Sequence, residues 1–278
     1  YTVTATDDNG TPASDSETVT VTITGSNDLP TVTVNGMDSD QVALTEGNAT
    51  LSDHGTLSVS DIDRADTVAP SVVSVQVSGV TTGLQSNNAA LLNMLSTNGS
   101  ASVANTAVIG NTVTEGTLYW AFDSGSEHFN LLAAGEQLVL TYTVRASDSA
   151  SGNTDRSVTV TITGSNDTPT VTVASPSDFV EAVDASAQVL SASGNVAFAD
   201  ADASDQIDVG FLPLAPAVWS GGLLSPTLAQ SLVNGFSVSA NNVAVTSPVS
   251  WTYSQVASDL DFLGAGETIK FSYTVLVT

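Results

Sequence analysis

One passage of the sequence occurs twice: TVTVTITGSNDLPTVTV at 18–34 returns as SVTVTITGSNDTPTVTV at 157–173. Gly25 and Gly164 hold the same place in the two copies and are 139 positions apart. Further matches follow in the same order: YTVTATDDNG at 1–10 with YTVRASDSAS at 142–151 and YTVLVT at 273–278, LSVSDIDRAD at 57–66 with VAFADADASD at 196–205, and 118–144 with 249–275. A period this long is typical of whole domains joined end to end, and not of a solenoid step.

Within each copy the local pattern is that of β-strands. Val19, Val21 and Ile23 alternate with threonines through Thr24, so apolar side chains share one face of a predicted strand. Clusters of Gly, Asn, Asp and Ser separate many short runs of this kind, which is typical of an antiparallel sandwich. Two segments, 86–96 and 225–235, break the pattern and predict short helices, the second with Ser225 as its cap and a proline at its first position.

The predicted fold class is therefore all-β, with tandem Ig-like antiparallel β-sandwiches that each carry a short helical insertion. The repeat divides the chain into 1–28, the C-terminal hairpin of a preceding repeat, 29–167, a complete repeat, and 168–278, a second repeat that lacks its last strand. Because residue 1 begins inside a strand pattern, we interpret the chain as an internal part of a longer protein. A sandwich without its last strand exposes an edge, and we expect that edge to be bare or to pair with a neighbouring chain's 17–24.

Charge and composition exclude several classes of function. Only four basic residues, Arg64, Arg145, Arg156 and Lys270, oppose 29 acidic ones, and the formal net charge is −25. Such a surface repels nucleic acid and anionic membranes and attracts cations. There is no cysteine, so disulfides and thiol chemistry are absent, and no apolar run approaches the roughly 20 residues of a membrane-spanning helix.

The acidic residues gather where two copies join. Between the predicted strands that end near Thr24 and begin near Thr31 only GSNDLP intervenes, and Pro30 stiffens it. Following chain direction through the sandwich, we expect the DIDRAD loop and the SDSASGN hairpin (147–153) at the upstream junction, and the DADASD loop with two glutamates at the downstream one. The candidate metal ligands are Asn27, Asp28, Asp61, Asp63, Asp66 and Asp148 upstream, and Glu46, Glu136, Asn166, Asp167, Asp200, Asp202 and Asp205 downstream.

Clusters of this kind need a counter-cation. Two carboxylates about 4 Å apart repel by roughly 1 kcal/mol in water and by about 4 kcal/mol near a protein surface. Few basic side chains are available, and six to eight flexible oxygen ligands describe Ca²⁺ better than Mg²⁺. DIDRAD and DADASD lack the glycine and distal glutamate of an EF-hand loop, so the predicted calcium sites are of another type.

No set of residues indicates catalysis. His54 and His128 stand in unrelated loops without a histidine or cysteine partner, which argues against a zinc site. Trp120 and Trp251 occupy nearly corresponding places in the two copies, which favours packing in the core over stacking on a sugar. We expect no enzyme, and we keep 209–222, VGFLPLAPAVWSGG, as the loop that could bind a ligand in one copy alone.

The repeated motifs resemble those of a known family. The run GE-x-L-x-L-x-Y-T-V, an aspartate-containing hairpin and then V-T-I-T-G-S-N-D-x-P resembles the VCBS and cadherin-like repeats of giant bacterial RTX adhesins, over nearly the whole chain. The resemblance implies Ig-like extender modules with Ca²⁺ at their junctions, exported by type I secretion to the bacterial cell surface. In the cadherin comparison Glu46, Asn166, Asp167, Asp200 and Asp202 match the residues around each ion.

The function that follows is a structural one. We expect a Ca²⁺-rigidified extender, or spacer, of a secreted adhesin that supports adhesion or biofilm formation, with neighbouring repeats of the same chain as its partners. Surface carbohydrate or protein ligands would bind through other domains, and neither nucleic acid nor direct membrane insertion is expected. The alternative is a carbohydrate- or ligand-binding module on the same Ig-like fold, which would carry aromatic or polar loops found in one copy only.

Overall fold

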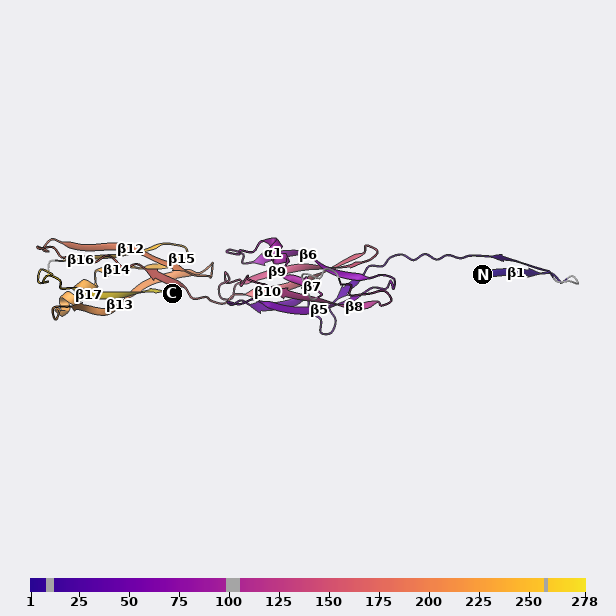
Figure 1. Cartoon of the computed structure of the whole chain (residues 1–278), viewed down its shortest axis with the longest axis horizontal. Helices are drawn as coiled ribbons and strands as arrows, with labels where there is room; N and C mark the ends of the chain where they lie inside the picture. Colours follow the sequence, from indigo (N-terminus) through magenta and orange to yellow (C-terminus); the bar gives the residue numbers. More distant parts are fainter. Residues whose placement is uncertain (9–12, 99–105, 258–259) are drawn as a thin grey trace.

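The computed structural model describes residues 1–8, 13–98, 106–257 and 260–278, and these residues form an elongated all-β chain (Figure 1). A hairpin lies at the N-terminal end, and an extended segment leads from it to two β-sandwiches placed one after the other. Two hydrophobic clusters, one in each sandwich, make up the cores. In the described part of the chain, no helix has both the length and the apolar character needed to cross a lipid bilayer.

The N-terminal hairpin consists of β1 (Thr2–Thr6) and β2 (Ser14–Thr18), and both strands are exposed along their whole length. Thr2 pairs with Thr18 in this hairpin, as Thr143 pairs with Ser157 in the first sandwich. The prediction that the strand continues to Thr24 is wrong, because β2 ends at Thr18 and 19–30 are not in a strand. Val19 forms backbone bonds with Tyr1, but no described strand lies beside 20–30. Without a neighbouring strand, these residues cannot form the hydrogen-bonded ladder of a sheet.

The first sandwich has two four-stranded sheets. One has the order β3 (Thr31–Thr33), β5 (Ser52–Ser60), β8 (Glu115–Asp123), β7 (Leu95–Thr97). The other has the order β4 (Gln41–Thr45), β10 (Asn153–Thr163), β9 (Gln137–Asp148), β6 (Val68–Gly79). Alternate residues of β9 point into the core, as the period of two predicts. One pair departs from the antiparallel expectation, since β4 runs parallel to β10, the last strand of the sandwich.

The second sandwich follows the same plan with fewer strands. Its first sheet has the order β11 (Thr170–Val173), β12 (Val189–Ala199), β16 (Val249–Val256), β14 (Phe236–Ser237). Its second sheet has the order β15 (Ala240–Ala244), β13 (Gln206–Trp219), β17 (Ile269–Val277), so β17 is an edge strand among the described residues. The predicted all-β class of tandem, Ig-like sandwiches is confirmed.

Both sandwiches carry a short helix where one was predicted. These are α1 (Asn88–Leu92), capped by the side chain of Asn87, and α2 (Pro226–Val233). Ser225 caps α2 by accepting the backbone N–H of Leu228 over 3.2 Å, as predicted. Equivalent tyrosines hold both helices to the cores: Tyr142 donates to Leu91 O over 2.9 Å, and Tyr273 donates to Val233 O over 2.7 Å.

In each sandwich a glycine lies in close contact with a core tryptophan. A Cβ on Gly55 would lie 2.5 Å from Cζ2 of Trp120, and a Cβ on Gly194 would lie 2.7 Å from Cε2 of Trp251. Both tryptophans are almost fully buried, which confirms that they pack in the cores. Glycine therefore lets each indole lie flat against the neighbouring strand.

The stretch 209–222 is mostly strand, and its description as a loop is wrong. Residues up to Trp219 belong to β13, which pairs with β17 through irregular register shifts at Pro213/Ala215 and Ala215/Val218. The pairing of β13 with β15 ends at Val209, so the prolines come after it, where one side of β13 has no partner strand. A proline costs little there, because the N–H that it lacks has no carbonyl to bond.

Candidate metal sites at the domain junctions

Loops at the ends of strands bring the predicted acidic residues together. Strand β5 ends at Ser60, and the next residues carry Asp61, Asp63 and Asp66. Asp148 is the last residue of β9 and lies at the same pole of the first sandwich, because it pairs with Val68, just after this loop. The chain direction inferred from the repeat therefore places the upstream group correctly.

The junction segment GSNDLP binds directly to this group. The side-chain amide of Asn27 donates to Oδ2 of Asp148 over 3.1 Å. The backbone N–H of Asp28 donates to Oδ2 of Asp63 over 2.7 Å. Both bonds fasten the linker to the sandwich that follows it.

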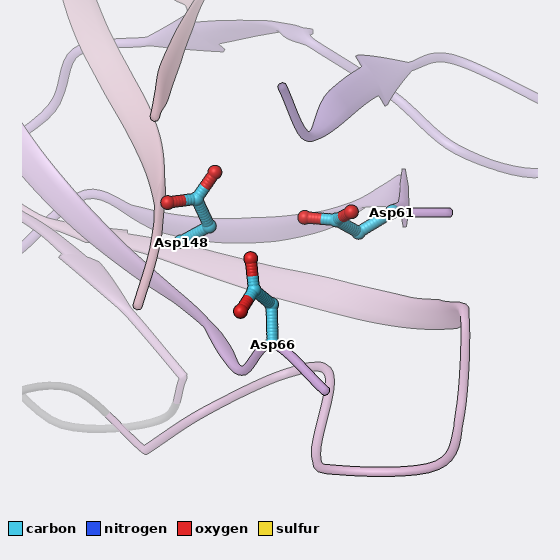
Figure 2. A group of neighbouring side chains, drawn as sticks. All are labelled: Asp61, Asp66 and Asp148. Carbon is cyan, nitrogen blue, oxygen red and sulfur yellow. The ribbon is translucent and has the colours of Figure 1, made fainter. Parts of the chain in front are cut away.

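Three carboxylates of the upstream group converge on one space (Figure 2). Asp61, Asp66 and Asp148 each place one oxygen within 4.8 Å of the others. Oδ1 of Asp148 accepts the backbone N–H groups of Ala150 and Gly152, at 2.9 and 2.6 Å, which fixes this side chain. Asp61 is 3% exposed, and its Oδ2 has no hydrogen-bond partner among the described residues.

The downstream junction repeats the backbone pattern of the upstream one. Asp167 donates its N–H to Oδ2 of Asp202 over 2.8 Å, as Asp28 does to Asp63. Inside the loop, Asp202 N–H bonds Oδ1 of Asp200 over 3.3 Å, as Asp63 N–H bonds Oδ1 of Asp61 over 3.0 Å. The two loops therefore share one local fold.

Unlike the upstream loop, the downstream loop also packs against another sandwich. The backbone N–H of Ala203 donates to Leu131 O over 3.2 Å, and its side chain packs against the core cluster of the first sandwich. Ser204 donates to Oε1 of Glu136 over 2.8 Å. The 202–205 turn is thus fastened to the first sandwich by both backbone and side-chain bonds.

Burial and negative neighbours raise the pKa of two downstream acids, Asp202 and Asp205. Burial first, and then repulsion from Asp205, Asp200 and Asp167, raises the pKa of Asp202 to about 6, although the N–H of Asp167 acts in the opposite direction. Burial, Asp200 and Glu136 likewise raise the pKa of Asp205. Oδ1 of Asp202 and Oδ2 of Asp167 are shielded from solvent and lack a hydrogen-bond partner in the part of the chain described. A bound cation would favour the ionised forms of these groups.

Three predicted ligands make different contacts. Glu46 is buried and accepts the N–H and hydroxyl of Ser165 through Oε1, at 2.8 and 2.7 Å, so it lies beside the residue before Asn166. Glu136 also accepts the N–H of Ala133 over 3.1 Å. Asn166 is exposed and donates to the carbonyl of the next residue over 2.6 Å. Metal binding by these thirteen residues stays a prediction.

The sequence reasoning missed three serine hydroxyls that donate hydrogen bonds to the predicted acidic ligands. Ser149 donates to Oδ1 of Asp66 over 3.0 Å, and Ser165 and Ser204 make the bonds to glutamate described above. Each is adjacent in sequence to a predicted ligand, Asp148, Asn166 or Asp205, and that adjacency was the available signal. These hydroxyls orient the carboxylates within each group.

In the described part of the chain no ion pair joins a basic side chain to a junction carboxylate, although Arg64 belongs to the DIDRAD loop itself. Arg145 forms a two-point ion pair with Asp155, at 2.6 and 2.8 Å. Arg156 pairs with Asp40. Both arginines are thus engaged along the strands, so the junction carboxylates suit a hard divalent cation.

Comparison with known proteins assigns no family. No protein-family model matches the chain, and no curated protein matches its sequence. Among solved structures, it is similar to cadherin domains 1–4 of protocadherin gamma B7, with 16% identity and a TM-score of 0.38 over 99% of this chain and 56% of that one. It is also similar to the CooA pilin subunit of enterotoxigenic Escherichia coli, with 12% identity and a TM-score of 0.32 over 51% of this chain and all of that one. TM-scores this low establish neither a shared family nor a shared function.

Proposed function

We propose that this chain is a Ca²⁺-rigidified extender of a secreted bacterial cell-surface adhesin, and that it supports adhesion or biofilm formation as a spacer. The observation that carries the proposal is the repeated bond from the linker aspartate to the DxDxxD loop, Asp28 to Asp63 and Asp167 to Asp202. A feature that recurs in each copy suits a spacer, whereas a binding module needs a feature found in one copy only. The resemblance to VCBS and cadherin-like RTX repeats supports the bacterial, extracellular assignment.

The chemistry of the donor set fits calcium. Shielded carboxylate oxygens without hydrogen-bond partners are costly unless a cation compensates them. Asp61, Asp66 and Asp148 would hold an ion at the upstream junction. At the downstream one, Asp167, Asp200 and Asp202 would do so, with Glu136 beside them. A bound Ca²⁺ supplies positive charge and ties together segments distant in sequence.

The linker between the two sandwiches is short, so an ion bound there would restrict their relative motion. Between β10, which ends at Thr163, and β11, which begins at Thr170, only six residues intervene. Pro169 restricts one of them, and direct bonds already join the 202–205 turn to the first sandwich. An ion held by ligands from both the linker and the loop would remove the remaining rotation.

The carbohydrate-binding alternative has weaker support. Trp120 and Trp251 are buried in their cores, so neither presents a face for stacking on a sugar. Trp219 donates to Oε2 of Glu267 over 3.1 Å and packs edge-on against Phe262. A non-catalytic structural role agrees with this arrangement.

Calorimetric titration of the whole chain with CaCl₂ tests the proposal. We expect saturable binding in wild type, a lower stoichiometry in Asp61→Asn and Asp202→Asn, and no change in the control Asp53→Asn. Asp53 is the second residue of β5, accepts the backbone N–H of His54 and is not a candidate ligand, and its substitution removes the same charge. Absence of binding heat, together with identical small-angle scattering in Ca²⁺ and in EDTA, would contradict the proposal.

A further inference from the structure

A methyl group of the second sandwich packs against a notch on the first. This methyl group is the side chain of Ala203, in the DADASD loop, and it lies against the core cluster of the first sandwich. A Cβ on Gly83 would lie 3.2 Å from Cβ of Ala203 and 3.4 Å from Cβ of Leu131. We call the surface formed by Gly83 and Leu131 the Gly83 notch. Because Gly83 has no side chain, Ala203 can approach the backbone there.

The notch is built by turns of the first sandwich. Gly83 follows β6 and has a φ of +89°, which glycine adopts without strain. Its turn is closed by a bond from Leu84 N–H to Thr81 O, over 3.1 Å. Leu131 is only 8% exposed, and its carbonyl accepts the N–H of Ala203 over 3.2 Å. The notch therefore holds the loop of the second sandwich by a backbone bond as well as by packing.

The loop of the first sandwich carries a much larger residue at the same position. The two loops make the same turn, since Asp66 N–H bonds Asp63 O over 2.9 Å and Asp205 N–H bonds Asp202 O over 3.1 Å. The fourth residue of DIDRAD is Arg64, which is exposed, and the fourth residue of DADASD is Ala203. An arginine in the notch would displace Leu131 or push the two sandwiches apart, because the space there holds one methyl group.

The second sandwich has a different surface at the matching place. The offset between the core tryptophans puts Phe262 and Glu267 in the places of Leu131 and Glu136. Trp219 packs edge-on against Phe262, with ring centroids 4.8 Å apart, and donates to Glu267. An aromatic pair thus stands where the first sandwich has the notch, so the notch is a property of one copy and does not follow from the fold alone.

We propose that the Gly83 notch is a docking site that selects the following sandwich by the size of one loop residue, and that it sets the mean direction between the two sandwiches without calcium. Ala203 is the residue that determines this specificity. A small side chain lets the loop reach Leu131 O, and a larger one holds the loop away. A sandwich with the DADASD loop therefore fits behind the first sandwich, and one with the DIDRAD loop does not.

This proposal goes beyond calcium binding. The side chains of Ala203, Gly83 and Leu131 carry no charge, so their contact needs no cation. An ion at the junction would restrict motion about the mean direction, whereas the notch determines what that direction is. The two proposals therefore concern different quantities and can fail separately.

Residual dipolar couplings of the whole chain measure the mean angle between the two sandwiches. We expect wild type to keep in EDTA the mean angle that it has in Ca²⁺. Ala203→Ser should retain this angle, and Ala203→Leu and Ala203→Arg should change it. Ala201→Arg is the matched control and should also retain it, because it adds the same charge and bulk to an exposed position of the same loop. The spread about the mean angle reports on calcium instead.

Amide exchange in EDTA provides a local readout. Ala203→Leu should speed exchange of the residue-203 amide by roughly tenfold relative to Ala203→Ser, after correction for intrinsic rates, because the bond to Leu131 O is lost. The melting temperature of each variant shows that both sandwiches remain folded. A mean angle of wild type that differs between EDTA and Ca²⁺ would overturn the proposal. Equal effects of Ala203→Arg and Ala201→Arg, or a wild-type angle in Ala203→Leu, would also overturn it.

Discussion

Asp167 donates its backbone N–H to Oδ2 of Asp202 over 2.8 Å, and this bond joins the segment that leaves the first sandwich to a loop of the second. The 200–205 loop could not shift without breaking both this bond and the neighbouring bond from Ala203 N–H to Leu131 O. The remaining oxygen of Asp202 has no hydrogen-bond partner among the residues described, although the residue is fully buried. The junction is therefore both fixed in geometry and short of positive charge.

Removal of calcium should destabilise the chain. A site exposed to free ion at a hundred times its dissociation constant contributes about 2.7 kcal/mol, and independent sites add. We expect EDTA to lower the melting temperature by roughly 10 °C for a sandwich of this size. Differential scanning calorimetry in Ca²⁺ and in EDTA measures this, and coincident curves would contradict it.

Asp61→Asn and Asp202→Asn should act on separate sites. Each replaces a buried carboxylate by a neutral amide of similar shape, at opposite poles of the first sandwich. The losses of bound calcium should add in the double variant, as expected for distant positions. Metal analysis after gel filtration gives the stoichiometry, and a double variant that loses no more ion than either single variant would show one shared site.

Calcium-free stability should depend on pH through Asp202. Its pKa is raised to about 6 in the folded chain, so between about pH 4 and 6 the folded state holds a proton that the unfolded state has released. The protonated Asp202 therefore contributes to the free energy of unfolding below pH 4, and this contribution is lost as the pH rises through 6. In EDTA, wild type should lose stability relative to Asp202→Asn over this window, as measured by urea unfolding. A constant difference between the two would refute this assignment.

The same carboxyl group should make calcium affinity depend on pH. The ion binds the ionised form, so the apparent affinity of the downstream site should increase up to about pH 6 and then level off. Titrations at pH 5 and pH 7 test this. Asp202→Asn, which retains only the upstream site, provides the control.

Alanine at Gly55 should cost more stability than alanine at Gly194. Both substitutions push a Cβ against an indole, and overpacking of a closed core costs about 1–3 kcal/mol. Trp120 is held by the bond from its Nε1 to Ser39 O, whereas Nε1 of Trp251 has no hydrogen-bond partner among the described residues, so the Trp251 indole is freer to shift. Urea unfolding compares the two variants, with Gly47→Ala, whose Cβ meets nothing within 4 Å, as the control. A larger loss for Gly194→Ala would contradict this account.

The sequence repeat predicted much of the fold because strand pairing follows local pattern. The β1–β2 hairpin has the register of β9–β10, although only the second pair lies in a sandwich. The Ser225 cap also follows from local chemistry. By contrast, 19–24 and 158–163 have the same sequence, yet only the second is in a strand, because a strand depends on its partner as well as on its own residues.

The sequence predicted which acidic residues lie near one another, but not the hydrogen bonds that they form. Chain direction alone places Asp61 and Asp148 at one pole, and the structure brings their oxygens within 4.8 Å. The contact of Glu46 with Ser165, and that of Glu136 with Ser204, depend on the path of short turns. Such paths follow from packing between elements, which periodicity does not encode.

The parallel pair of β4 and β10 has a mechanical consequence. Tension along the chain pulls β4 from its N-terminal end and β10 from its C-terminal end, in opposite directions along their common axis. The pairs from Gln41–Thr159 to Thr45–Thr163 are then loaded together, in shear, and cannot be peeled apart one by one. In the first sandwich these two strands therefore resist stretching until all five pairs break together.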